Sequence, residues 1–263
     1  MRPTLPAHTA PSVPVVKKGG EVAIKGHDRI YAIGDLHGCA DLFARILREI
    51  RNDVRVRGQG TTTRIILLGD LIDRGPRSRD LVAMAMRFVT SDTGVIVLRG
   101  NHEDMLLRAA NGSAAAQRVW LRNGGAQTLT SFGFDPAQLS GLDTADRARA
   151  ISDAIGPDTI EWFATLPTQF RSGDYFFCHA GVRPGVPLHQ QSTRDLLWIG
   201  KEFARSTLDH GAVIVHGHAE ARRVEFRPNR INVDTGAYRT GRLSAIGLEG
   251  AHRWTLRVEQ EVS

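Results

Sequence analysis

The stretch RIYAIGD at residues 29–35 sets the pattern from which the fold can be inferred. It is a short apolar run that ends abruptly at a glycine and a carboxylate. The same pattern returns at residues 64–70 (RIILLGD), and similar runs end in polar residues at 95–102 (VIVLRGNH), 175–179 (YFFCH) and 213–218 (VIVHGH). Runs that are apolar on both faces are typical of buried strands. We therefore expect buried strands that each end in polar side chains.

Helical patterns separate the first three of these runs. Apolar residues recur at helical spacing over residues 42–50 and again over residues 81–89. Strand–helix–strand alternation predicts an α/β fold with a doubly wound core. Ligands of such folds bind beyond the carboxyl ends of the strands. All of the polar clusters fall at those ends, which is the main indication of an active site.

The remaining segments complete the predicted domain organisation. Residues 1–22 are rich in proline and small side chains, which predicts a disordered tail, and residues 23–263 are predicted to form a single domain. Helical patterns within residues 103–170 predict a mostly helical cap insertion over the strand ends. Apolar segments between residues 231 and 258, separated by glycines, predict antiparallel strands.

Composition excludes several classes of protein. The chain has 263 residues, of which 41% are hydrophobic and 24% are charged, so it is neither disordered overall nor collagen-like nor a coiled coil. No apolar run approaches the roughly 18 residues that span a bilayer, and no N-terminal stretch resembles a signal peptide. Cys39 and Cys178 show no metal-cluster spacing, which favours a reducing compartment. We expect a soluble cytoplasmic protein without a membrane partner.

The polar side chains at the strand ends form a chemically coherent set. They are carboxylate, amide and imidazole groups, which suit hard-to-borderline divalent metals rather than a structural zinc site. A single Asp could be a helix cap, and a single His could be a core residue. Several such groups at neighbouring strand ends are harder to explain structurally, because buried charge needs a partner or a metal. The set comprises Asp35, His37, Asp70, Asn101, His102, His179 and His218.

These residues carry a resemblance to a known family. Three blocks resemble the signature blocks of the phosphoprotein phosphatase family: GDLHG at 34–38, GDLIDRG at 69–75 and RGNHE at 99–103. The later blocks HAG (179–181), GH (217–218), WLRNGG (120–125) and NVDTGAY (232–238) resemble its bacterial and bacteriophage branch, within the calcineurin-like metallophosphoesterases.

The resemblance implies a fold and a metal centre. The fold is a metallophosphoesterase-like αββα sandwich with a mostly helical cap insertion. Two divalent ions are implied, with manganese expected first and iron, zinc, cobalt or nickel as alternatives. The first metal would be held by Asp35, His37 and Asp70. The second would be held by Asp70, which bridges, with Asn101, His179 and His218.

The resemblance also implies a mechanism. A hydroxide that bridges the two metals would attack the phosphorus in line, without a phospho-enzyme. His102 would be the general acid for the leaving alkoxide, and Asp73 would orient its imidazole. Arg74 would clamp the phosphoryl oxygens, and Asn101 would contribute to substrate binding as well as to the metal.

One departure from the family pattern affects substrate binding. The bacterial branch usually has an arginine directly after a Trp-Ile pair, where this chain has Gly200 and then Lys201. Lys201, Arg183 or Arg194 are candidates to replace that phosphate arginine, and Lys201 and Arg183 are predicted to bind substrate. We expect phosphate binding to be weaker than is usual in the family.

Three functions are compatible with these residues. The first is a metal-dependent serine/threonine protein phosphatase that acts on a phosphoprotein or a small phosphoester. The second is a symmetrical dinucleoside tetraphosphatase or another nucleotide phosphohydrolase, although that sister family usually has Asp where this chain has Glu103. The third is a non-catalytic protein that binds phosphate or nucleic acid, because the net charge is +6. Intact ligands argue against the third, nucleic acid is not the expected partner, and the oligomeric state is left open.

Overall fold

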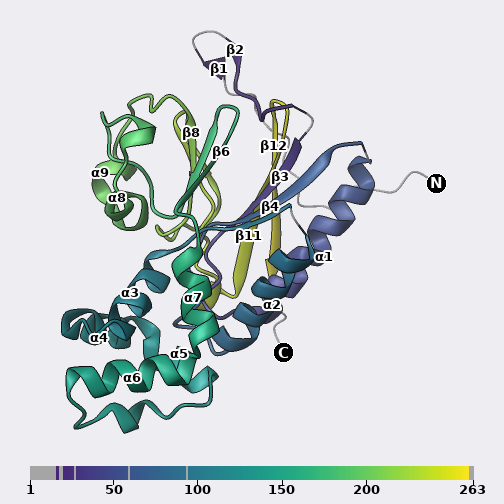
Figure 1. Ribbon diagram of the computed structural model, residues 1–263. Coiled ribbons are helices and arrows are strands. Elements are labelled where there is room, and N and C mark those ends of the chain that lie inside the picture. The colour runs from purple at the N-terminus through teal and green to yellow at the C-terminus, as the bar shows by residue number, and fades with distance from the viewer. Residues whose placement is uncertain (1–15, 18–19, 27, 59, 93, 261–263) are drawn as a thin grey trace.

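Two sheets lie face to face in the computed structural model, which describes residues 16–17, 20–26, 28–58, 60–92 and 94–260 (Figure 1). The first sheet has the order β12 (His252–Glu259), β11 (Arg242–Glu249), β3 (Asp28–Ile33), β4 (Thr62–Leu67) and β5 (Val95–Val97). The second has the order β6 (Gln169–Ser172), β7 (Tyr175–Cys178), β8 (Val213–His216), β10 (Arg230–Asn232) and β9 (Glu225–Phe226).

Helices cover the outer sides of both sheets. In Figure 1, α1 and α2 run along the first sheet and α8 and α9 along the second, while α4, α5 and α6 project below them. The helices are α1 (Ala40–Arg57), α2 (Ser78–Ser91), α3 (Asn101–Ala110), α4 (Ala114–Trp120), α5 (Ala126–Ser131), α6 (Thr144–Ile155), α7 (Pro157–Thr165), α8 (Thr193–Trp198), α9 (Lys201–Ala204) and α10 (Ala237–Thr240). Two short 3-10 turns (Pro136–Leu139 and Leu188–Gln190) and a π-helical turn (Leu121–Gly125) complete the list.

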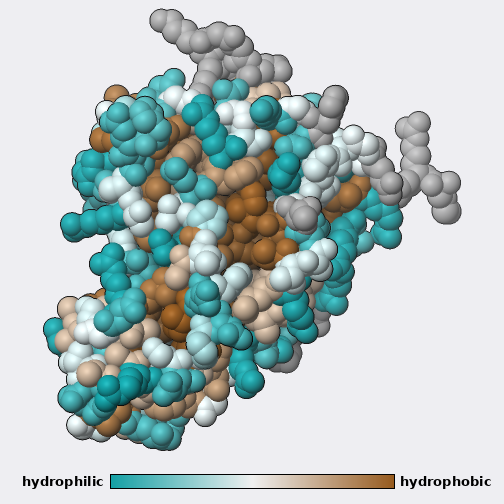
Figure 2. All heavy atoms as spheres, viewed as in Figure 1, coloured by the Kyte–Doolittle hydropathy of each residue, from teal (hydrophilic) through white to brown (hydrophobic). Residues whose placement is uncertain are grey.

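Alternation along β3 explains why two sheets can share one core. Tyr31 and Ile33 belong to the apolar cluster beneath α1 and α2, whereas Ile30 and Ala32 belong to the cluster between the sheets. A strand that is apolar on both faces must be covered on both faces. Helices cover one face of this sheet and the second sheet covers the other. Figure 2 shows apolar residues gathered where the sheets lie, with hydrophilic residues over the helices around them.

The structure confirms the αββα sandwich and corrects one expectation. A doubly wound core would place helices on both faces of a single sheet, but here α1 and α2 pack on the same face. The strands β7, β8 and β10 form a separate sheet that replaces the second helical layer. Strand–helix alternation alone could not reveal this, because a sheet and a helix layer bury the same apolar face.

Helices dominate the predicted insertion. The described helices α3 to α7 lie between β5 and β6, and their buried side chains merge with the cluster beneath α1 and α2. The cap boundary and the single-domain assignment stay predictions. The predicted tail lies largely outside the described residues, although within it Val16–Lys17 (β1) pairs antiparallel with Gly20–Glu21 (β2). None of the described helices is long and apolar enough to span a membrane.

A buried carboxylate ties α1 to the first sheet. Asp53 accepts hydrogen bonds from the Tyr31 hydroxyl at 2.7 Å, from Trp254 Nε1 at 2.8 Å and from Arg57 Nε at 2.9 Å. Burial and the Asp53 carboxylate raise the pKa of Tyr31 above its ordinary value. The Tyr31 hydroxyl therefore stays a donor to Asp53, and the bonds from Tyr31 and Trp254 hold the helix against the sheet, while the Arg57 contact lies within α1.

Replacing this carboxylate should destabilise the protein strongly. In Asp53→Ala, Tyr31 and Trp254 keep buried donors without an acceptor, so we expect the free energy of unfolding to fall by about 3–5 kcal/mol. Denaturant unfolding followed by circular dichroism measures this. The control Asp80→Ala removes only a surface ion pair with Arg77 and should lose far less. Equal losses in the two variants would contradict the assignment.

Candidate metal centre

The predicted site residues converge at one edge of the sandwich. The strands β3, β4 and β5 are parallel neighbours, so the loops that carry Asp35, Asp70 and Asn101 lie side by side. The strands β7 and β8 are parallel neighbours in the second sheet and deliver His179 and His218. The polar ends of five strands therefore meet, as the sequence pattern predicted.

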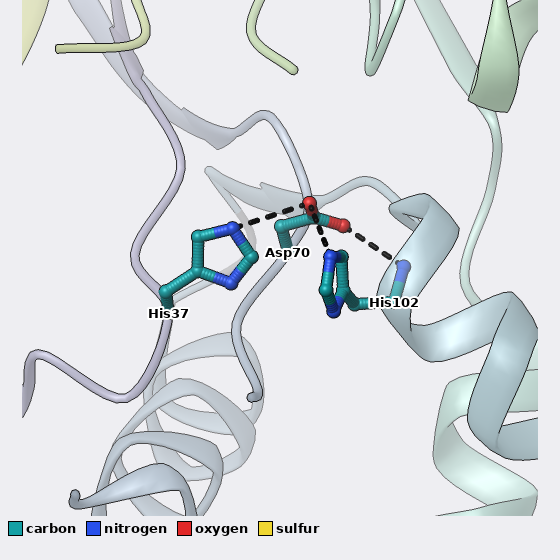
Figure 3. A group of neighbouring side chains, drawn as sticks. All are labelled: His37, Asp70 and His102. Atoms are coloured by element: carbon teal, nitrogen blue, oxygen red, sulfur yellow. Dashed lines mark hydrogen bonds and ion pairs between the residues drawn. The ribbon is translucent and has the colours of Figure 1, made fainter. Parts of the chain in front are cut away.

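Asp70 lies at the centre of this arrangement. Figure 3 shows the imidazoles of His37 and His102 turned toward its carboxylate from different sides. Asp70 Oδ2 lies 3.5 Å from His37 Nε2, 3.4 Å from His179 Nε2 and 3.8 Å from His102 Nε2, while Asp70 Oδ1 accepts the His102 backbone N–H at 3.0 Å.

Backbone carbonyls orient two of the imidazoles. His37 Nδ1 donates to the carbonyl of Ile72 at 2.8 Å, and His179 Nδ1 donates to the carbonyl of Leu68 at 2.9 Å. The Nε2 atom of each neutral ring therefore carries a lone pair. Burial lowers the pKa of His37 to about 3 and also lowers that of His179, so both rings stay neutral. Imidazoles oriented in this way are typical metal ligands.

Ring nitrogens of His179 and His218 lie close to the amide oxygen of Asn101, so that lone pairs face one another. A metal ion between these atoms would remove the repulsion. His179 Nε2 lies 2.7 Å from Asn101 Oδ1, and His218 Nδ1 lies 2.9 Å from the same oxygen. The ligand atoms of His37, Asp70 and His102 lie within 4.8 Å of one another, and so do those of Asp70, His179 and His218. The two groups share Asp70, so these residues could hold two divalent ions, which would activate water and stabilise charge on a phosphoryl group.

Asp35 contributes charge but stands apart from both groups. Its carboxylate accepts the His218 backbone N–H at 3.2 and 3.0 Å. Burial and the nearby carboxylates of Asp234 and Asp70 raise its pKa well above its ordinary value. A cation would relieve this repulsion, so the surroundings of Asp35 favour bound metal. Its role as a direct ligand stays a prediction.

His102 is held from both sides of its ring. Asp73 Oδ2 lies 2.6 Å from His102 Nδ1, and Arg74 Nη2 lies 3.2 Å from His102 Nε2. Burial opposes protonation, yet Asp70 and Asp73 outweigh it and raise the pKa of His102. Although Nε2 lies near Asp70, the adjacent guanidinium disfavours a second cation there. The position therefore suits a proton donor better than a metal ligand.

Backbone strain concentrates in these loops. Among the described residues, five that are not glycine have positive φ, between 41° and 73°: His37, Asp70, Asp73, Arg74 and His218. Such conformations are costly for residues with a Cβ and persist where surrounding contacts impose them. Close approach explains Gly100 in the third block, because a Cβ there would collide with Asp70. All five strained residues belong to the predicted site.

The Glu103 carboxylate holds the backbone next to Asp70 through hydrogen bonds. It accepts the backbone N–H groups of Gly100 at 2.7 Å, Leu71 at 2.8 Å and Asp70 at 3.0 Å. Glu103 lies in the first turn of α3 and is fully buried. It therefore holds the backbone of the central residue Asp70.

For three further residues at the site, no role was predicted from the sequence. Asp234 adds a buried carboxylate whose pKa burial raises to about 7. Tyr238 stacks edge-on against His37 at 5.3 Å and lies 4.9 Å beneath the Arg74 guanidinium. Its hydroxyl donates to Glu220, which lies 3.7 Å from Arg74. The block at 232–238 was the available signal for Asp234 and Tyr238, whereas nothing local singled out Glu220.

The predicted substrate cations Arg183 and Lys201 lie elsewhere. They line a groove of about 600 Å³ beside α8 and α9, together with Trp198 and Gly200. Arg183 is engaged by Asp195 at 2.6 and 3.0 Å and by Glu202 at 3.0 and 3.1 Å. Two carboxylates therefore already contact the Arg183 guanidinium, and its role in substrate binding stays a prediction. The role of Lys201, which is exposed, stays a prediction.

Comparison with known proteins supports this interpretation of the site. The profile of the calcineurin-like phosphoesterase family matches residues 28–241. Serine/threonine-protein phosphatase 1 of Salmonella typhimurium is 29% identical over 236 residues, which cover 87% of this chain and 95% of that protein. A symmetrical bis(5'-nucleosyl)-tetraphosphatase of Nitrosospira multiformis is 28% identical and covers 78% of this chain, which spans 66% of that protein.

Solved structures agree on the fold. A candidate diadenosine tetraphosphatase has a TM-score of 0.63 at 22% identity and covers 92% of this chain and 98% of its own. A protein serine/threonine phosphatase of Saccharomyces cerevisiae has a TM-score of 0.56 at 15% identity, covering 90% of this chain and 81% of its own. At these identities the likeness concerns the fold alone.

Metal binding can be tested without any substrate. Chelator-stripped protein titrated with Mn²⁺ should bind two ions per chain and melt at a higher temperature, because the ions relieve repulsion around Asp35 and Asp70. At a hundredfold excess over Kd the gain is about 2.7 kcal/mol per site. His37→Ala should keep about one ion, and Asp70→Asn should bind neither tightly. The surface control Asp158→Asn should match the wild type. An unchanged melting temperature in the wild type would contradict the metal centre.

Proposed function

The chain belongs to the calcineurin-like phosphoesterase family, and from that premise we propose that it is a metal-dependent serine/threonine protein phosphatase. The observation that carries the proposal is the buried pair of Asp73 and His102 beside the buried carboxylate of Asp70. Phosphoserine leaves as an alkoxide of high pKa and needs a proton. A histidine that is held by a carboxylate at the metal centre supplies that proton.

The residues of the site divide the work of hydrolysis. Bound divalent ions would lower the pKa of a water molecule and stabilise charge on the phosphoryl oxygens. Arg74, whose side chain is 30% exposed, lies where it can reach an incoming phosphoryl group with its planar fork. His102 Nε2 faces the same space and delivers the proton to the departing oxygen.

Arg74 and His102 are linked through one hydrogen bond. Arg74 Nη2 donates to His102 Nε2, which requires that atom to be unprotonated. When Arg74 turns to the phosphoryl oxygens, Nε2 is released to hold a proton, while Nδ1 stays on Asp73. Phosphate binding would thereby prepare the general acid.

Two finer assignments accompany the proposal. We propose Mn²⁺ as the working metal, because the candidate ligands are imidazole nitrogens and carboxylate or amide oxygens. We propose the cytoplasm as the compartment, because Cys39 and Cys178 are both free.

A dinucleoside tetraphosphatase is the second candidate, favoured by the matches to proteins of that name. Two features favour the protein phosphatase. The Salmonella phosphatase matches nearly its full length, and residue 103 is Glu, where the nucleotide hydrolases usually have Asp. When a dinucleoside tetraphosphate is cleaved, the leaving group is a phosphate. A leaving phosphate depends less on a general acid than a leaving alkoxide does.

Substrate comparison tests the proposal directly. Mn²⁺-loaded protein should hydrolyse p-nitrophenyl phosphate and a phosphoserine peptide, and its kcat/KM for the peptide should exceed that for a dinucleoside tetraphosphate. Asp70→Asn should lose at least about a hundredfold in kcat because it disrupts both metal groups. Asp158→Asn serves as the control. Faster cleavage of the tetraphosphate would replace the proposal by the second candidate.

Gly200 provides a test of phosphate binding. A Cβ at this position would meet no atom within 4 Å, but the backbone of Gly200 (φ −119°, ψ −115°) lies outside the regions that residues with a Cβ usually adopt. Restoring the family arginine in Gly200→Arg should raise kcat/KM by about tenfold or more, since a charged hydrogen bond contributes about 1.5–3 kcal/mol. Gly200→Ala controls for backbone effects. No difference between the two variants would show that this position does not reach the substrate.

A further inference from the structure

The Asp73 carboxylate is shared between the active site and the helical insertion. Asp73 Oδ2 lies 2.6 Å from His102 Nδ1. Asp73 Oδ1 accepts hydrogen bonds from Trp120 Nε1 at 3.0 Å and from Thr128 Oγ1 at 2.6 Å. All four side chains are at least 99% buried. One oxygen is thus occupied by the insertion, and only the other faces His102.

This division prevents the carboxylate from turning. Rotation about the Cβ–Cγ bond would exchange the two oxygens and break the bonds to Trp120 and Thr128. Each of these would leave a buried donor unsatisfied, which is costly. The plane of the carboxylate therefore stays fixed. A fixed acceptor at Nδ1 in turn fixes the direction in which His102 Nε2 points.

Thr128 also holds the backbone of the same residue. Its hydroxyl oxygen accepts the Asp73 backbone N–H at 2.9 Å while its proton goes to Asp73 Oδ1. Ser78 Oγ lies 3.2 Å from the same backbone nitrogen. Asp73 has a φ of 73°, and these contacts offset that strain.

The local geometry of the insertion places Trp120 against the backbone turn at residues 73–74. A kink within Leu121–Gly125 separates α4 from α5, where the backbone of Gly124 is non-helical. Gly125 lies beneath the Trp120 indole, where a Cβ would come within 2.5 Å of the ring. Gly124 has a φ of 112° and packs against the backbone of Arg74. Both glycines permit the close approach of the insertion to the residues at 73–74.

From this geometry we infer that Trp120 and Thr128 are positioning residues for the general acid. They hold Asp73 so that His102 points its Nε2 atom toward the leaving group. The inference rests on the proposed function, since it concerns proton donation by His102. It assigns the helical insertion a part in the chemistry, in addition to any role in covering the site.

Substrates with different leaving groups distinguish a positioning role of Trp120 and Thr128 from a simple packing role. A general acid matters for a phosphoserine peptide, whose alkoxide needs a proton, and matters little for p-nitrophenyl phosphate, whose phenolate leaves unaided. A packing defect would reduce both rates alike. The informative quantity is therefore the ratio of kcat for the peptide to kcat for p-nitrophenyl phosphate.

The variants remove single hydrogen bonds while keeping shape. Trp120→Phe loses the indole N–H, and Thr128→Val loses the hydroxyl. We expect each to lower kcat for the peptide about five- to tenfold, a part of the 10²–10⁴ that general acids contribute, with kcat for p-nitrophenyl phosphate changed less than about twofold and KM unchanged. Thr128→Ser keeps a hydroxyl and should restore most of the peptide rate.

Matched controls come from the same insertion. Trp162→Phe and Thr130→Val make the same chemical changes at positions that do not contact Asp73, since the Thr130 hydroxyl donates to the Ala126 carbonyl. Both should keep the wild-type ratio. Circular dichroism and the metal content of each variant are measured alongside, so that rates are compared only between folded, metal-loaded proteins.

His102→Asn is the reference that keeps the two proposals apart. If it lowers the ratio and the Trp120 and Thr128 variants do not, the inference is overturned and the proposed function stands. If His102→Asn itself leaves the ratio unchanged, its role as general acid fails, and the inference fails with it. Should Trp120→Phe not fold, Thr128→Val and its rescue by Thr128→Ser decide the question.

Discussion

Asp70 is a buried carboxylate on a left-handed backbone, and the loops around it are arranged to maintain both features. Its φ is 52° and it is 2% exposed. Glu103 accepts its backbone N–H, and Gly100 leaves room for its side chain. Neutral imidazoles then point their lone pairs at the same space. A buried carboxylate among lone pairs is unfavourable without a cation, so the protein is built to gain stability from metal.

The sandwich brings the two halves of this centre together. One half comes from the ends of β3, β4 and β5, and the other comes from the ends of β7 and β8 in the second sheet. The apolar layer between the sheets, which contains Ala32, Ile66 and Val215, holds the two sheets together. Packing far from any ligand thereby determines whether His179 reaches Asp70. The helical insertion joins the other apolar cluster, beneath α1 and α2, and places Trp120 and Thr128 against Asp73.

Prediction from the sequence succeeded where a local pattern carried the information. The apolar runs ending in Gly-Asp marked β3 and β4, and the order of the blocks indicated which side chains would meet. It failed where distant partners decided the outcome. Arg183 has the right charge for a phosphate clamp, and only the structure shows that Asp195 and Glu202 contact its guanidinium. Glu103 looked like an ordinary residue of a helix start, and only its contacts with the loop after β4 show its importance.

The sequence by itself determined the strands, the helical insertion and the identity of most metal-site residues, because each depends on residue types at short spacing. Only the tertiary structure decided which strands form the second sheet and that Asp73 divides its oxygens between His102 and the insertion. Trp120 and Thr128 lie 47 and 55 residues from Asp73 along the chain. Long-range hydrogen bonds of that kind produce no periodic pattern in the sequence. They depend on the positions of the side chains in the folded protein and not on their separation along the chain.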